Sequence, residues 1–192
     1  MSDRVVLDHD DLRRTLVRIA HEIVEKNDDG DGIALVGIHT RGAVLSKRLH
    51  ALVGELSGTA VPLGDIDISF YRDDVGRHRS DLAAPVVHDS HLDFELEGRT
   101  VILVDDVLYT GRTARAGIDA LFDYGRPDRV QLAVLADRGH RELPIRPDYV
   151  GKNLPTAPGE RVNVRLEETD GRDEVAITPA GERAAASREE ER

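Results

Sequence analysis

The 192-residue chain contains no cysteine, no tryptophan and a single methionine, and aromatic residues make up only 4% of it. Without cysteine it forms no disulfide and has no thiolate to act as a nucleophile or metal ligand. No apolar run approaches the ~20 residues that cross a bilayer as a helix. Residues 1–4 (MSDR) open with charge and lack the apolar segment of a signal peptide. We therefore expect a cytoplasmic protein with no membrane partner.

Basic residues are also scarce: 26 lysines and arginines stand against 37 acids, for a formal net charge of −11. This balance argues against broad, non-specific nucleic-acid binding, although it leaves room for a local basic face. Only Lys26, Lys47 and Lys152 are lysines. Because arginine binds phosphate bidentately, a few arginines still suffice for a strong phosphate site. Salt adaptation or codon bias explains the excess of arginine equally well.

Apolar patterns predict a single α/β domain over residues 1–178, followed by a small, charged and disordered tail at 179–192. Helical spacing predicts helices at 7–26, 43–53 and 113–124. Apolar or alternating runs predict strands at 33–38, 64–71, 101–104, 130–136, 161–166 and 174–177. Strands that alternate with helices indicate a twisted, mainly parallel sheet covered on both faces. Ligands of such sheets bind beyond the carboxyl ends of the strands.

The most informative segment is residues 101–113 (VILVDDVLYTGRT), in which a buried strand ends in Asp105 and Asp106. The N–H groups and hydroxyls of residues 110–113 can hold a phosphate at the positive end of the next helix. Gly111 lets the backbone approach that phosphate closely. The two carboxylates can accept hydrogen bonds from a sugar diol or hold a hydrated Mg²⁺. The plainer interpretation, an acidic strand end before an ordinary capped helix, leaves two adjacent carboxylates to water alone.

This segment resembles the signature of the type I phosphoribosyltransferases, which use 5-phosphoribosyl diphosphate (PRPP). Residues 37–42 (GIHTRG) resemble the diphosphate loop of that family, whereas on their own they would indicate a turn with a surface arginine. The resemblance implies the family's α/β fold with a small hood, and Mg²⁺ as cofactor. The implied PRPP-binding residues are Thr40, Arg41, Gly42, Asp105, Asp106, Tyr109, Thr110, Gly111, Arg112 and Thr113.

A polar, poorly periodic segment follows at 72–85, and loops of this length in compact domains are usually functional or mobile. In the family the corresponding loop closes over the substrate, which excludes water from a reactive sugar cation. Arg72 would then reach the diphosphate and act in catalysis with Arg41, Asp105 and Asp106. The alternative is a solvated arginine in a loop.

Residues 137–153 (DRGHRELPIRPDYVGKN) narrow the resemblance to family members that make UMP from uracil and also regulate pyrimidine genes. They imply a base-binding hood at about 137–177. The implied uracil-binding residues are Val107, Tyr109, Asp137 and Arg138. Purine-using relatives commonly carry an aspartate at the position of Tyr109, so the tyrosine favours a pyrimidine.

Asp148 resembles an acid that helps to ligate Mg²⁺ in related purine enzymes. We therefore expect Asp105, Asp106 and Asp148 to hold Mg²⁺, directly or through water. A plain turn aspartate is the other interpretation of Asp148.

The same resemblance implies a surface that binds leader mRNA under the control of a pyrimidine nucleotide, and a homo-oligomer. In the 7–26 helix, Arg14, Arg18 and His21 are spaced four and three apart, opposite the apolar stripe that begins at Leu12. The implied RNA-binding residues are Arg14, Arg18, His21, His140, Arg141 and Arg146. An ordinary solvated helix face is the alternative interpretation.

Three other functions remain open on these residues. One is a salvage enzyme without an RNA role, and another is an RNA regulator with vestigial catalysis, against which the intact acids and arginines argue. The third is a purine phosphoribosyltransferase, against which Tyr109 argues. No paired metal-binding histidines, Ser/His/Asp arrangement or dinucleotide motif suggests a different chemistry.

Overall fold

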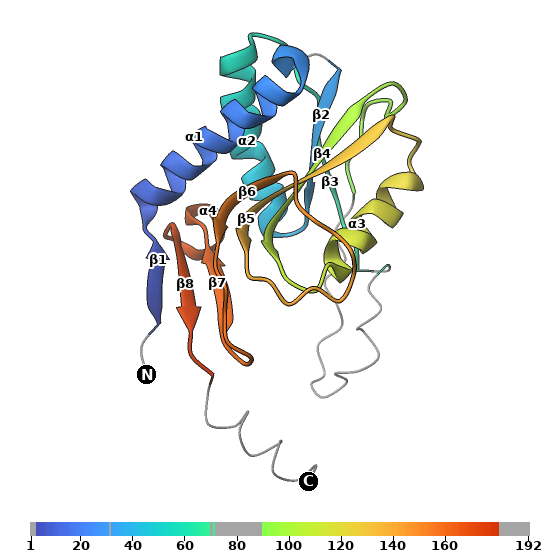
Figure 1. The fold of residues 1–192 in the computed structure, drawn as a ribbon. Coiled ribbons are helices and arrows are strands. Elements are labelled where there is room, and N and C mark those ends of the chain that lie inside the picture. The colour runs from blue at the N-terminus through green and yellow to red at the C-terminus, as the bar shows by residue number, and fades with distance from the viewer. Residues whose placement is uncertain (1–2, 31, 70, 72–89, 181–192) are drawn as a thin grey trace.

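Figure 1 shows the fold in a computed structural model, which describes residues 3–30, 32–69, 71 and 90–180. Arg72, the arginine expected in the loop, lies outside the described residues. Residues 181–192 of the expected tail also lie outside them. None of the helices in the described part of the chain is both long and apolar enough to span a membrane.

The main sheet has five parallel strands in the order β3-β2-β4-β5-β6. These strands are β2 (Ile33–Ile38), β3 (Leu63–Ile66), β4 (Thr100–Leu108), β5 (Arg129–Asp137) and β6 (Tyr149–Asn153). The predicted parallel α/β sheet is thus confirmed. Gly37 of β2 pairs with Val104 of β4, so the loop that follows β2 begins level with Asp105.

Helices cover both faces of this sheet, with α1 (His9–Lys26) and α2 (Arg41–Ser57) on one side and α3 (Arg112–Phe122) on the other (Figure 1). Alternate residues of a strand therefore enter different cores: Ile102 packs in the core of α1 and α2, and Leu103 in the core of α3. The predicted stripe of α1 is buried, with Leu12, Leu16, Ile19 and Ile23 at most 4% exposed.

A second, antiparallel sheet in the order β1-β8-β7 lies at the lower left of Figure 1. It is formed by β1 (Arg4–Leu7), β7 (Arg161–Arg165) and β8 (Glu174–Thr178), and the short helix α4 (Glu167–Asp170) joins β7 to β8. The sequence patterns predicted β7 and β8 but neither β1 nor α4. Leu7, expected in the first helix, instead ends β1, because the Asp8 side chain caps α1 by accepting from the Asp11 N–H at 2.8 Å.

Other boundaries differ from the sequence predictions as well. The strand expected at 64–71 ends at Ile66, and α2 extends beyond both ends of the expected 43–53. The segment at 149–153, where no strand was predicted, forms β6. Gly151 interrupts its apolar pattern, because a Cβ there would lie 2.3 Å from the Leu135 carbonyl and 2.8 Å from Thr15 Cγ2 of α1.

A buried polar cluster joins the end of α1 to β5 and β6. The Asn27 side chain donates to the Tyr149 hydroxyl at 2.9 Å and to Gln131 Oε1 at 3.2 Å, and the tyrosine hydroxyl donates to the same Oε1 at 2.7 Å. Burial raises the pKa of Tyr149, which keeps this hydroxyl protonated as a donor.

We expect Tyr149→Phe to lower the free energy of unfolding by roughly 1–3 kcal/mol, because it leaves buried amide groups without their hydroxyl partner. Equilibrium denaturation in urea measures this loss. Tyr124→Phe is the matched control, since Tyr124 is 52% exposed. Equal stability of the two variants would show that the Tyr149 hydroxyl contributes nothing to the free energy of unfolding.

Candidate active site

A cleft of about 220 Å³ opens where β2 and β4 end. Its walls come from the loop after β2, the segment after β3, the end of β4 and the start of α3. The lining residues are His39, Thr40, Arg41, Ile68, Asp105, Asp106, Val107 and Thr113. Residues predicted from two separate motifs, at 37–42 and 101–113, therefore meet in one cleft.

Two glycines allow the first turn of α2 to lie directly on the sheet. A Cβ on Gly42 would lie 2.4 Å from the Val104 carbonyl oxygen and 3.2 Å from Asp105 Cα. A Cβ on Gly37 would lie 2.4 Å from Ala43 Cα. Only residues without a side chain fit these positions, and the close approach brings Thr40 and Arg41 beside the two aspartates. The His39–Thr40 peptide bond in this loop is cis.

The two aspartates at the end of β4 have different surroundings. Asp105 is 7% exposed and accepts a hydrogen bond from the Asp106 N–H at 2.9 Å. Asp106 is half-buried and accepts from the Val107 N–H at 2.8 Å. Desolvation raises the pKa of Asp106, against the opposing effects of that N–H and of the nearby Arg41 charge. A desolvated carboxylate of this kind favours the arrival of a cation or of hydroxyl donors.

Helix α3 also begins at the cleft. Gly111, at a φ of +94°, precedes its first residue, and Thr113 lines the cleft. The Thr110 hydroxyl accepts from the Arg112 N–H at 3.3 Å. Since the first N–H groups of a helix have no partner within it, α2 and α3 together bring two positive helix ends to the same cleft. Two anionic groups can thus be held on either side of the aspartates.

Arg41, the first residue of α2, supplies the cleft with a fixed cation. Its Nη2 lies 2.8 Å from Asp170 Oδ1, so the guanidinium is held from the α4 side. Its Nε is buried and finds no hydrogen-bond partner among the residues that the structure describes. A buried donor without a partner is costly, and an anion bound beside it would remove that cost.

The segment after β5 is fastened to the turn that precedes α3 by Arg141. Its Nη1 donates to the Tyr109 carbonyl at 2.8 Å, its Nε to the Ile145 carbonyl at 2.9 Å and its Nη2 to Asp137 Oδ2 at 2.5 Å. The ring of Tyr109 is 44% exposed, and the Arg138 guanidinium stacks over it at 4.0 Å from the ring centroid.

A second cleft, of about 480 Å³, borders this segment. It is lined by Asp137, Arg138, Gly139, His140, Asn153, Pro155 and Thr156. The expected uracil-binding residues are therefore divided between two neighbouring places. Asp137 and Arg138 line the second cleft, Val107 lines the first, and the Arg138 stack places Tyr109 next to the second.

Contrary to the sequence prediction, the structure does not bring Asp148 to Asp105 and Asp106. Asp148 Oδ1 pairs with Lys26 Nζ at 2.7 Å, and its Oδ2 accepts from the Leu132 N–H at 3.0 Å. Its carboxylate therefore fastens the start of β6 to α1 and β5. Within the described parts of the chain, no group of three or more acidic or histidine side chains is arranged to hold a metal ion.

The six residues expected to bind RNA fall into two groups. Arg14, His21 and Arg146 have exposed side chains, and Arg14 pairs with Asp11 at 2.7 Å. The other three also bond within the protein, although Arg18, with a side chain 47% exposed, and His140 are exposed as well. Arg18 donates to the carbonyls of Val150 and Gly151 at 2.9 and 2.6 Å, His140 Nε2 lies 2.7 Å from the Thr156 carbonyl, and Arg141 has the contacts described above.

Two residues beside the cleft were not predicted. His39 lines it, and its Nε2 lies 2.6 Å from Asp65 Oδ1 of β3. Its place in the segment 37–42, which resembles the diphosphate loop and implied the neighbouring Thr40 and Arg41, was the available signal. Asp170, the partner of Arg41, is 129 positions away in the chain and no local pattern marks it.

Comparison with known proteins identifies the family. The family model described as "Phosphoribosyl transferase domain" matches residues 6–169. A protein named "Bifunctional protein PyrR" from Deinococcus radiodurans is 56% identical over 173 residues, which cover 90% of this chain and 92% of that protein. The protein of the same name from Listeria welshimeri is 54% identical over 173 residues, covering 90% of this chain and 94% of the relative.

The fold has counterparts among solved structures. The hypoxanthine phosphoribosyltransferase of Trypanosoma cruzi superposes with a TM-score of 0.69 at 17% identity, covering 94% of this chain and 98% of that one. A Staphylococcus aureus hypoxanthine phosphoribosyltransferase gives 0.68 at 19% identity, covering 92% and 91%. These distant likenesses establish the fold, while the relatives at 54 and 56% identity show to which group within the family the chain belongs. The chain therefore belongs to the phosphoribosyltransferase family and, within it, to the group of bifunctional PyrR proteins.

Proposed function

We propose that this protein transfers the phosphoribosyl group of PRPP to uracil, giving UMP and diphosphate, and that it regulates pyrimidine genes by nucleotide-dependent binding to leader mRNA. The observation that carries the enzymatic half is the single cleft in which two helices begin on either side of Asp105 and Asp106. PRPP has the matching order of groups: a phosphate, a ribose with two hydroxyls, and a diphosphate.

The two helix ends, together with Arg41, support one orientation of PRPP in the cleft. Residues 110–113, at the start of α3, hold the 5′-phosphate through N–H groups and hydroxyls. The start of α2 holds the diphosphate, where Arg41 Nε has no other partner among the described residues. Asp105 and Asp106 accept hydrogen bonds from the ribose hydroxyls between them, and their charge stabilises the positive charge that develops on the sugar.

The site also suits Mg²⁺, because the environment that raises the pKa of Asp106 makes a nearby cation favourable. Protein sites commonly bind Mg²⁺ through one or two carboxylates together with substrate phosphates and water. Asp105 and Asp106 would hold the ion with PRPP, without Asp148. When bound, the ion would neutralise charge on the departing diphosphate.

Uracil would enter from the segment after β5. Tyr109, stacked beneath Arg138, offers an aromatic face, and Val107 offers an apolar contact. Asp137 is pre-positioned by Arg141 and by the Gly139 N–H at 3.0 Å. Most of the rate enhancement would then come from orientation and fixed charges rather than from a strong base.

The regulatory half of the proposal rests on family membership and on exposed basic groups. Arg14, His21 and Arg146 would contact RNA phosphates and unpaired bases directly. Arg18 and His140, which are exposed as well, would join them, and Arg141 would keep the segment after β5 in place. Nucleotide promotes RNA binding only if it binds the RNA-competent state more tightly than the other state.

The double variant Asp105→Asn/Asp106→Asn should lose UMP synthesis by at least about 100-fold, because the charge that stabilises the sugar cation is lost and both ribose contacts become weaker, neutral hydrogen bonds. Formation of UMP from uracil, PRPP and Mg²⁺ measures this. The variant should stay folded, since removal of a carboxylate with a raised pKa relieves a cost that grows as the pH rises from acid towards neutral.

Asp119→Asn/Asp128→Asn is the matched control, because both residues are exposed and lie outside the cleft. It should synthesise UMP at the rate of the unmodified protein. Full activity in the Asp105/Asp106 variant would refute the assignment of the cleft.

Arg14→Ala/Arg146→Ala should weaken binding to leader RNA by roughly tenfold and make it less dependent on salt, since two phosphate contacts would be removed. Titration with leader RNA from the organism's own pyrimidine genes, with and without UMP, measures this at fixed salt. The control is Arg126→Ala/Arg129→Ala, because both arginines are exposed and lie at or just before the start of β5. If the unmodified protein binds leader RNA no better than scrambled RNA, the regulatory half is wrong and an enzyme remains.

A further inference from the structure

The C-terminal segment that joins β7 to β8 reaches the cleft through one ion pair. Asp170, the last residue of α4, lies 2.8 Å from Arg41 Nη2. We propose that Asp170 is a positioning residue for PRPP: it fixes the Arg41 guanidinium in the lining of the cleft, ready to bind the diphosphate. This inference rests on the proposed function, since it concerns the same cleft.

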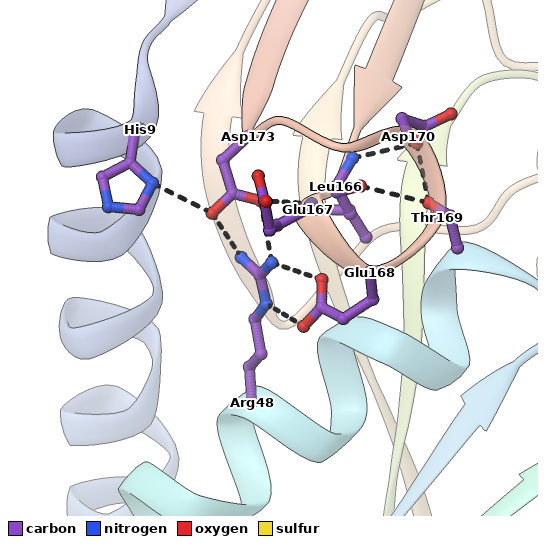
Figure 2. A network of polar contacts seen from close by, with 8 residues as sticks. All are labelled: His9, Arg48, Leu166, Glu167, Glu168, Thr169, Asp170 and Asp173. Atoms are coloured by element: carbon purple, nitrogen blue, oxygen red, sulfur yellow. Dashed lines mark hydrogen bonds and ion pairs between the residues drawn. The ribbon is translucent and has the colours of Figure 1, made fainter.

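Asp170 is itself held in place before any ligand arrives. Its Oδ2 accepts from the Leu166 N–H at 2.9 Å and from the Thr169 hydroxyl at 2.7 Å, which leaves Oδ1 facing Arg41 (Figure 2 shows the α4 contacts). Desolvation raises the pKa of Asp170, but these two donors and Arg41 outweigh it and lower the pKa to about 2. The carboxylate is therefore ionised at any pH where the protein works.

The helix that carries Asp170 is anchored to α2 at a second point. Arg48 donates to both carboxylate oxygens of Glu168, with Nε at 2.9 Å, and to both of Asp173, with Nη1 at 2.9 Å and Nη2 at 2.7 Å (Figure 2). Asp173 also accepts from the Glu167 N–H at 2.8 Å, and its side chain is only 5% exposed. The Asp173 carboxylate also contacts α1, where His9 Nδ1 lies 3.2 Å from its Oδ2.

Arg41 and Arg48 are seven residues apart in α2 and so lie on the same face of that helix. Arg48 binds Glu168 and Asp173, at the two ends of the segment 168–173, and Arg41 binds Asp170 between them, which fixes this segment relative to the cleft. The long arginine side chain has many rotamers, and holding it in one of them before binding removes an entropic cost from PRPP binding. Loss of the Asp170 contact should therefore raise the KM for PRPP and leave the KM for uracil unchanged.

The test compares Asp170→Asn with Glu167→Gln, which removes an equal charge from the same short helix at an exposed side chain that pairs with neither Arg41 nor Arg48. We expect Asp170→Asn to raise the KM for PRPP about tenfold, the effect of one charge-assisted hydrogen bond. The KM for uracil should stay within about twofold in both variants, and Glu167→Gln should leave the KM for PRPP within about twofold, the usual scale for substitution of an exposed side chain. An unchanged or lower KM for PRPP in Asp170→Asn would overturn the proposal, and a lower value would make Asp170 a competitor of the diphosphate.

A double-mutant cycle with Arg41→Met separates positioning from a general effect on stability. In the Arg41→Met background, Asp170→Asn should change the KM for PRPP no further, whereas additive effects would overturn the proposal. Thr169→Val, which removes a donor to Asp170 but keeps its charge, should give a smaller rise in the same KM and guards against a misfolded Asp170→Asn. Calorimetric titration with PRPP and Mg²⁺ gives the same comparison of affinities without turnover. A protein that binds PRPP but makes no UMP refutes the proposed reaction, and the affinities still decide the role of Asp170.

Discussion

The contact between the first turn of α2 and the backbone of β4 is the constraint on which the cleft depends. Gly42 has no space for a side chain beside the Val104 carbonyl, and Gly37 has none beside Ala43. Because the backbones touch there, Arg41 and the start of α2 lie next to Asp105 and Asp106. The helix end, the cation and the two carboxylates thus occupy one small volume, which is what a substrate with two anionic ends and a diol between them requires.

The cleft is not simply a basic pocket, because carboxylates pair with arginines in and around it. Arg41 pairs with Asp170, Arg112 with Glu142 at 2.8 Å and Arg141 with Asp137, so several cations near the cleft are already partnered by carboxylates. This agrees with the net charge of −11. Binding of a highly charged substrate then relies on helix N–H groups, on the remaining arginine donors and on Mg²⁺ carried in with it. Fixed dipoles of this kind need no rearrangement when charge develops.

Features set by neighbours in the chain were predictable. Strands β2 and β4, the pair Asp105–Asp106, the glycine at φ +94° before α3 and the buried stripe of α1 each follow from a short pattern. Features set by distant partners were not. Strand β6 escaped prediction because Gly151 must make room for α1, and Asp170 acquires its role only because β7 and β8 carry α4 across to Arg41.

Two residues whose roles were inferred from resemblance also depend on contacts with distant parts of the chain. Asp148 was expected near the metal, yet Lys26 and the Leu132 N–H hold it elsewhere. Arg141 is predicted to contact RNA, and the structure shows a further role that the sequence did not indicate, since its guanidinium joins Asp137, the Tyr109 carbonyl and the Ile145 carbonyl. In both residues the type of side chain was informative, but the direction in which it points depends on contacts that only the folded chain shows.

The most direct test of the account is a competition between bases. The protein would be supplied with PRPP, Mg²⁺ and equal concentrations of uracil and hypoxanthine, and the nucleotides formed would be separated and quantified. We expect UMP with one equivalent of diphosphate and no inosine monophosphate, because Tyr109 stands where purine-using relatives commonly carry an aspartate. Formation of the purine nucleotide, or of neither nucleotide, would contradict the function assigned to this cleft.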